Sequence, residues 1–115
     1  MDDRLKVAVV GGRDFNNEQQ LKNVLDKLKP THIVSGGARG ADTLAKDYAI
    51  HNKIPMYEYL ADWELHGKAA GPIRNKSIVK NSDMVVAFWD GKSRGTKSTI
   101  DIAKQYRKRL AVYNY

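Results

Sequence analysis

The chain has 115 residues, a formal net charge of +7 and no cysteine. A chain of this length forms one domain and buries roughly two-thirds of its unfolded surface, so we expect residues 1–115 to be a single domain. The lack of cysteine excludes a disulfide framework and a thiolate metal site, and no apolar run approaches the ~20 residues that span a bilayer.

The acidic start, residues 1–3, lacks the apolar core of a signal peptide. We therefore expect a cytoplasmic protein that does not interact with membranes. The positive charge favours an anionic partner, either a nucleotide or a nucleic acid, although a solvated basic surface explains it equally well.

Short apolar runs alternate with segments of helical period along the whole chain. The runs predict buried strands at residues 5–10, 32–35, 55–60, 83–89 and 110–113. The first helix presents an apolar face made by Leu21, Val24, Leu25 and Leu28. Its expected N-cap is Asn16 or Asn17, and Pro30 lies just beyond its end.

Three more helices are expected. Residues 43–51 predict the second, and Pro72 suits the first turn of a third that runs to residue 81. Ile100 and Ala103 mark the last helix. Alternation of strands with helices predicts an α/β fold with a doubly wound, five-stranded parallel sheet, of order 3-2-1-4-5, covered by helices on both faces. Ligands in such sheets bind at the carboxyl ends of the strands where the order reverses, here between strands 1 and 4.

Glycine-bearing turns follow strands 1, 2 and 4, so the strand order places them side by side. The first contains Gly11, Gly12, Arg13 and Asp14. The two glycines let a ligand approach the backbone. Arg13 offers a planar fork of donors to a phosphate, and Asp14 suits a ribose hydroxyl or an arginine. An ordinary strand-to-helix turn with surface charges is the alternative.

The second turn joins strand 2 to the second helix and carries three glycines. A helix N-terminus has N–H groups without helical partners and a partial positive charge, so this turn is suited to an anion. Its sequence is neither a dinucleotide fingerprint nor a P-loop. Asp42 is expected to cap the helix or to bind a ribose. The candidate ligand-binding residues here are Ser35, Gly36, Gly37, Ala38, Arg39, Gly40 and Asp42.

The third turn follows the most apolar strand and opens the last helix. Hydroxyl groups and glycine N–H groups in this turn also suit a phosphate. The candidate residues are Trp89, Asp90, Gly91, Ser93, Arg94, Gly95 and Thr96.

A fourth segment lies between strands 3 and 4. Trp63 stands in a polar stretch with Asp62 and is either a stacking surface for a base or a satellite core residue. Gly71, Arg74 and Asn75 begin a helix on the same edge, where Arg74 and Asn75 are placed to meet a phosphate or a sugar.

No metal site or cofactor is expected. His32, His51 and His66 have no ligand spacing, and no nucleophile–histidine–acid triad is evident. The catalytic residues, if there are any, are not identified by the pattern.

Taken together, the motifs resemble those of the small SLOG proteins related to YspA and cpYpsA. They are GGRDF at 11–15, VSGGARGAD at 34–42, ADW at 61–63, AGPIRN at 70–75 and FWDGKSRGT at 88–96. The resemblance covers nearly the whole chain and implies a Rossmann-like fold and a nucleotide-derived ligand. It also implies a homo-oligomer, because relatives often dimerise. Wider relatives include the "lonely guy" phosphoribohydrolases and the DNA-processing protein DprA.

The resemblance also bears on catalysis. Arg74 is similar to the arginine of the phosphoribohydrolases, and Gly95-Thr96 to the Gly-Thr of their PGGxGTxxE motif. The position of their glutamate is occupied by Thr99, and Asp101 points about 200° away on a helix. Three hypotheses follow: a module that senses or sequesters a nucleotide, a hydrolase that cleaves a nucleotide's N-glycosidic bond, and a DprA-like binder of single-stranded DNA. The missing glutamate favours the first.

Overall fold

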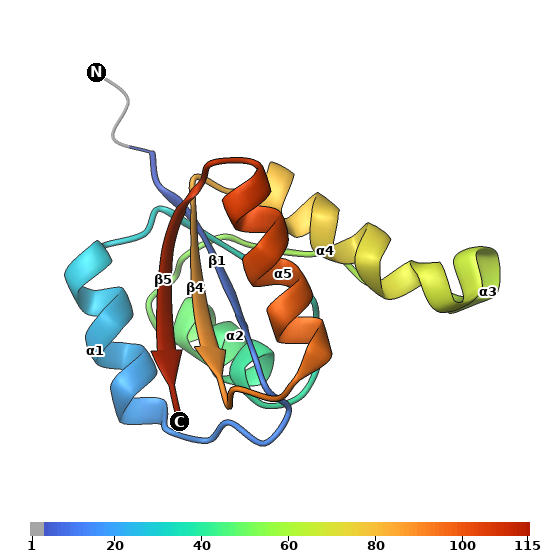
Figure 1. The fold of residues 1–115 in the computed structure, drawn as a ribbon. Helices are drawn as coiled ribbons and strands as arrows, with labels where there is room; N and C mark the ends of the chain where they lie inside the picture. The colour runs from blue at the N-terminus through green and yellow to red at the C-terminus, as the bar shows by residue number, and fades with distance from the viewer. Residues whose placement is uncertain (1–3) are drawn as a thin grey trace.

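The computed structural model of the protein describes residues 4–115, and residues 1–3, on which part of the localisation prediction rests, lie outside it. The five strands form one parallel sheet of order β3-β2-β1-β4-β5 with helices on both faces (Figure 1). The predicted fold class and strand order are confirmed. The strands are β1 (Lys6–Gly11), β2 (His32–Ser35), β3 (Met56–Glu58), β4 (Met84–Trp89) and β5 (Arg109–Asn114). The helices are α1 (Glu18–Leu28), α2 (Ala41–His51), α3 (Trp63–His66), η1 (Gly67–Ala69), α4 (Ala70–Lys80) and α5 (Arg94–Gln105).

Two hydrophobic cores lie on opposite faces of the sheet. Val7 and Val9 of β1 face the core shared with α1 and α2, whereas Ala8 and Val10 face the core shared with α4 and α5. Both faces are therefore covered, which is why the central strands are apolar at consecutive positions rather than at alternate ones. Figure 1 shows α1 and α5 on either side of the strands.

Helix α1 illustrates how local sequence signals set the helix bounds. The Asn17 side chain accepts a hydrogen bond from the Gln20 N–H (3.0 Å), so the N-cap is Asn17 rather than Asn16. The helix ends at Lys29, which adopts the left-handed conformation (φ 53°) and donates its N–H to the carbonyl of Leu25. Leu25 is fully buried, as the apolar period predicts.

The segment between β3 and α4 differs from the prediction. Strand β3 is only three residues long, and the short helices α3 and η1 precede α4, which begins at Ala70 so that Pro72 falls in its first turn. Residues 62–69 are all exposed, and α3 projects from the body of the molecule (Figure 1). The sequence pattern does not predict the helical turn of α3, because none of its side chains is buried and it therefore has no apolar period. It depends on Asp62, whose carboxylate accepts from the Leu65 N–H (3.0 Å).

No helix within residues 4–115 combines the length and the apolar content needed to cross a bilayer.

The turn after β2 packs directly on the turn after β1, and this contact depends on a glycine. Gly40 has a φ of +76°, and a Cβ there would collide with the Gly12 carbonyl oxygen and lie 2.6 Å from the Arg13 carbonyl carbon. We predict that Gly40→Ala lowers the free energy of unfolding by at least roughly 1–3 kcal/mol, the cost of such backbone strain. Urea denaturation measures the effect.

Gly95 is the matched control for this substitution. A Cβ at Gly95 meets no atom of the described residues within 4 Å, and the residue lies in α5 with an ordinary φ. Gly95→Ala should leave stability unchanged or raise it by up to about 1 kcal/mol. Equal stability of the two variants would show that the contact between the turns does not restrict position 40.

Candidate functional site

The turns after β1 and β2 and the start of α5 meet at one edge of the sheet. Strands β2, β1 and β4 are neighbours and all point the same way, so the ends of the three strands meet where the strand order reverses. A cavity of about 120 Å³ opens there. Its walls come from β1, from both of these turns, and from α2, α4 and α5. It is lined by Val10, Gly11, Arg13, Gly36, Ala38, Asp42, Arg74, Asn75, Ile78, Gly95, Thr96 and Thr99.

Arg74 is the central cation of this cavity. Its Nη1 donates to the carbonyl oxygen of Gly36 (2.9 Å) and its Nε to the side-chain oxygen of Asn75 (3.0 Å). The guanidinium is half-buried. These two bonds orient its plane and use two of its five N–H donors. Arg74 is therefore a pre-oriented donor at the junction of the turn after β2 and α4.

The approach of Arg74 to the backbone requires Gly36. A Cβ on Gly36 would lie 2.5 Å from Nη1 of Arg74. The buried Asn75 extends the connection, because its amide donates to the carbonyl of Gly95 (3.4 Å) at the start of α5. Two of the three glycine-bearing turns are thus linked through side chains of α4.

Asp42 is the one carboxyl group among the residues that line the cavity. It is 8% exposed, and its Oδ2 accepts from the N–H of Ala38 (3.0 Å). Burial raises the pKa of Asp42, although the Ala38 N–H and the charge of Arg74 act in the opposite direction. The expectation that Asp42 caps α2 is wrong. The N-cap is Gly40, and Asp42 lies inside the helix with its carboxylate bonded back to the turn.

The third turn is held by its own side chains. Oδ1 of Asp90 accepts from the N–H groups of Lys92 (2.8 Å) and Ser93 (2.7 Å), and these bonds, that from Ser93 first, lower the pKa of Asp90. Ser93 caps α5, and its carbonyl accepts from Nε1 of Trp89 (3.1 Å). Trp89 is therefore tied at its indole N–H to the turn that follows it.

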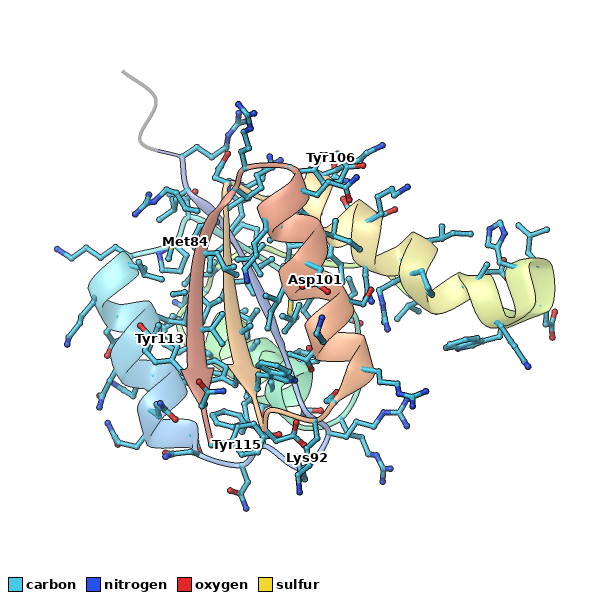
Figure 2. The ribbon with its side chains drawn as sticks, viewed as in Figure 1. Met84, Lys92, Asp101, Tyr106, Tyr113 and Tyr115 are labelled. Atoms are coloured by element: carbon cyan, nitrogen blue, oxygen red, sulfur yellow. The ribbon has the colours of Figure 1, made fainter. Side chains whose placement is uncertain are left out.

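Asp14, expected to meet a ribose, already has a partner within the protein. The hydroxyl of Tyr115 donates to its carboxylate (2.5 Å), which together with burial raises the pKa of Tyr115. Tyr115 also contacts the ring of Phe15 edge-on, with 5.1 Å between the centroids. Figure 2 shows Tyr115 beside the turn that carries Lys92. The contacts of Tyr115 with Asp14 and Phe15 hold the turn after β1 in place.

Other predicted site residues lie outside the cavity lining. Asp62 caps α3, and Trp63 lies exposed on the projecting segment, where a Cβ added to Gly71 would be 3.5 Å from its ring. The buried hydroxyl of Ser35 accepts from the N–H of Gly37. Ligand binding stays a prediction for these residues and for the remainder of the set: Gly12, Asp14, Arg39, Gly40, Trp89, Asp90, Gly91, Ser93 and Arg94.

Three lining residues were not among the predicted site residues. Val10 and Ile78 form part of the cavity wall, and the sequence pattern assigned such apolar residues only to the core. Thr99 also lines the cavity, and its hydroxyl donates to the carbonyl of Gly95 (3.3 Å). Asp101 is exposed and pairs with Lys97 (2.8 Å), on the outer side of α5 in Figure 2. No carboxylate takes the place of the glutamate of the phosphoribohydrolases on this helix.

The YspA, cpYpsA-related SLOG family (YAcAr) matches residues 5–66, more than half of the chain. The chain belongs to this family. The Gene 61 protein of Mycobacterium phage D29 is 41% identical over 103 residues, covering 80% of this chain and 82% of the phage protein. The predicted family resemblance is confirmed, and the matched region of this SLOG domain includes the turns after β1 and β2.

Two solved structures have similar folds. DNA processing protein A (DprA) from Streptococcus pneumoniae matches with a TM-score of 0.78 and 22% identity, over 95% of this chain and 50% of that chain. DprA from Helicobacter pylori, described for its single-stranded DNA binding mode, matches with a TM-score of 0.66 and 27% identity, over 94% of this chain and 64% of that chain. The SLOG chain spans less than two thirds of either DprA chain, and the first likeness shows the fold alone.

The raised pKa of Asp42 generates a pH-dependent prediction. Because the folded protein holds this proton more tightly than the unfolded chain, the stability contributed by the group is full below its ordinary pKa of 3.8 and is lost as pH rises through the folded value. We predict that Asp42→Asn becomes more stable relative to the wild type as pH rises from about 4 towards neutrality. Urea unfolding at a series of pH values measures the difference, and a difference independent of pH would contradict the assignment.

Proposed function

We propose that this SLOG protein binds a nucleotide or nucleotide-derived small molecule through its phosphate, as a sensing or sequestering module. The observation that carries the proposal is Arg74, which is half-buried at the point where the strand order reverses and is oriented by Gly36 and Asn75. A planar guanidinium with uncommitted donors binds phosphate in a fixed geometry.

Positive potential from several sources supports the proposal. Arg13 lines the same cavity as Arg74. Helices α2 and α5 begin beside the cavity, at Ala41 and Arg94. Each helix N-terminus stabilises a nearby negative charge by about 0.3–1 kcal/mol, and by more when partly buried. The carboxyl of Asp42 on the α2 side suits a sugar hydroxyl rather than a phosphate.

The size of the cavity limits how a ligand is held. At about 120 Å³ it is smaller than the roughly 300–1,000 Å³ of most small-ligand sites. We infer that it encloses the phosphate and part of the sugar, and that the base lies outside it.

Family membership and the fold neighbours support a module that binds a nucleotide or a nucleic acid, without distinguishing between the two. The DprA of Helicobacter pylori binds single-stranded DNA, and the net charge of +7 suits either ligand. We favour the small molecule because the cavity beside Arg74, at about 120 Å³, suits a single phosphate group. We also propose that the protein is a homo-oligomer and is cytoplasmic. Sedimentation, which measures the mass in solution, tests the oligomer.

Hydrolysis of an N-glycosidic bond is the second candidate, and Asp42 is the observation that favours it. Its raised pKa and its position in the cavity suit a group that exchanges protons with a sugar or a leaving base. Free base released from a nucleoside monophosphate by the wild type, and not by Asp42→Asn, would establish this activity.

The phosphate contact is tested by Arg74→Ala. A charge-assisted hydrogen bond contributes about 1.5–3 kcal/mol, so we expect affinity to fall by roughly ten- to a hundredfold. Calorimetric titration with nucleoside mono- and diphosphates, cyclic mononucleotides and an oligodeoxynucleotide measures the loss.

Arg109→Ala is the matched control, since it removes the same charge from an exposed position at the start of β5, the opposite end of the sheet. Equal losses of affinity in the two variants would show that only the net charge matters, and would contradict the proposal. Tight binding of the oligodeoxynucleotide alone would replace the small molecule with single-stranded DNA.

A further inference from the structure

We propose that a second cavity, which shares Arg74 with the first, is a nucleobase subsite that takes a purine and prefers guanine. This inference rests on the proposed function, because it extends the same ligand outward from the first cavity. That cavity, lined by Arg13, Asp42 and Arg74, is the proposed phosphate cavity. The second cavity measures about 250 Å³ and lies between the end of β3 and the segment formed by α3 and α4.

Arg74 joins the two spaces, since it lines both the phosphate cavity and the second cavity. Gly37 lies at the same boundary: a Cβ there would be 2.5 Å from Cδ2 of Leu60 and 3.2 Å from Oε2 of Glu58. Both of those residues line the second cavity. Together the two cavities reach the size of ordinary small-ligand sites, roughly 300–1,000 Å³. A nucleotide whose phosphate meets Arg74 in the first cavity therefore has room for its base in the second.

Two large apolar side chains of the second cavity are uncovered. Leu60 is 70% exposed and Ile73 is 43% exposed, and both line this space. Large apolar side chains gathered in a concave site mark a surface that is covered when a ligand binds. The flat face of a purine has the shape and the apolar character to cover these two side chains.

The polar groups of the second cavity include two carboxylates beside Arg74 and His66, whereas the phosphate cavity has one carboxyl group. Oδ1 of Asp62 is engaged by the Leu65 N–H. Glu58 pairs through Oε1 with Lys46 (3.3 Å), and its Oε2 lies beside Gly37 at the boundary between the cavities. Carboxylates repel a phosphate but accept the N–H donors of a base edge.

The carboxylate of Glu58 gives the site its preference among bases. Guanine presents two adjacent donors, N1–H and the 2-amino group, to one carboxylate. Hypoxanthine keeps N1–H but lacks the amino group, and adenine has an acceptor at N1. A charge-assisted pair of this kind discriminates more strongly than a contact between neutral groups.

The experiment compares GMP, IMP, AMP and ribose 5-phosphate by calorimetric titration. We expect GMP to bind about tenfold more tightly than IMP, and both to bind more tightly than ribose 5-phosphate. Glu58→Gln should remove the preference for GMP over IMP while leaving the affinity for ribose 5-phosphate unchanged. Ile73→Ala should weaken GMP binding several-fold, whereas Ile50→Ala, at an exposed position on α2 outside both cavities, should not.

The outcomes separate this inference from the proposed function. Ribose 5-phosphate binding as tightly as GMP, with Glu58→Gln and Ile73→Ala silent, would overturn the base subsite and leave the phosphate site standing. A preference for AMP would overturn the role given to Glu58. If no phosphate compound binds and Arg74→Ala changes nothing, the proposed function itself fails. Unfolding curves for each variant confirm that the protein tested is folded.

Discussion

The contact between the backbone of the turn after β1 and the turn after β2 is the constraint on which the rest of the site depends. The carbonyl oxygen of Gly12 accepts hydrogen bonds from the N–H groups of Phe15 (3.2 Å) and Ala41 (3.3 Å). This approach leaves no room for a Cβ on Gly40. Backbone contacts therefore fix the start of α2 relative to the turn after β1, in addition to the side-chain core that α2 shares with β1.

The close packing of the two turns gives their glycines a structural role that the sequence alone does not reveal. Gly11 is close-packed as well, because a Cβ there would lie 2.7 Å from both the Ala41 Cβ and the Phe88 carbonyl. These glycines bring strands and helices together, whatever contact they make with a ligand. The donor on which the proposed function rests comes from α4, through Arg74, for which Gly36 makes room.

The sequence was sufficient for the fold because its signals are local. Apolar runs and helical faces give the strands and helices, and the handedness of the crossovers gives the order of the sheet. The sequence was also sufficient to predict that the glycine-bearing turns lie at one edge of the sheet. The contacts that assign roles to individual side chains are long-range, such as Tyr115 with Asp14 and Arg74 with Gly36. Turn composition carries no information about such partners, so the sequence does not predict the internal bonds of Asp14 and Asp62.

The position of the buried carboxyl group separates this cavity from that of the phosphoribohydrolases it resembles. Their glutamate belongs to the helix equivalent to α5, where this chain has Thr99 with its hydroxyl bonded to its own helix backbone. The carboxyl of this protein, Asp42, stands on α2 instead. Burial raises its pKa, and a carboxyl that keeps its proton to higher pH repels a bound phosphate less. A carboxyl group on α2 does not occupy the place of an acid on α5, which is why we propose binding beside Arg74 first and hydrolysis through Asp42 only as the second candidate.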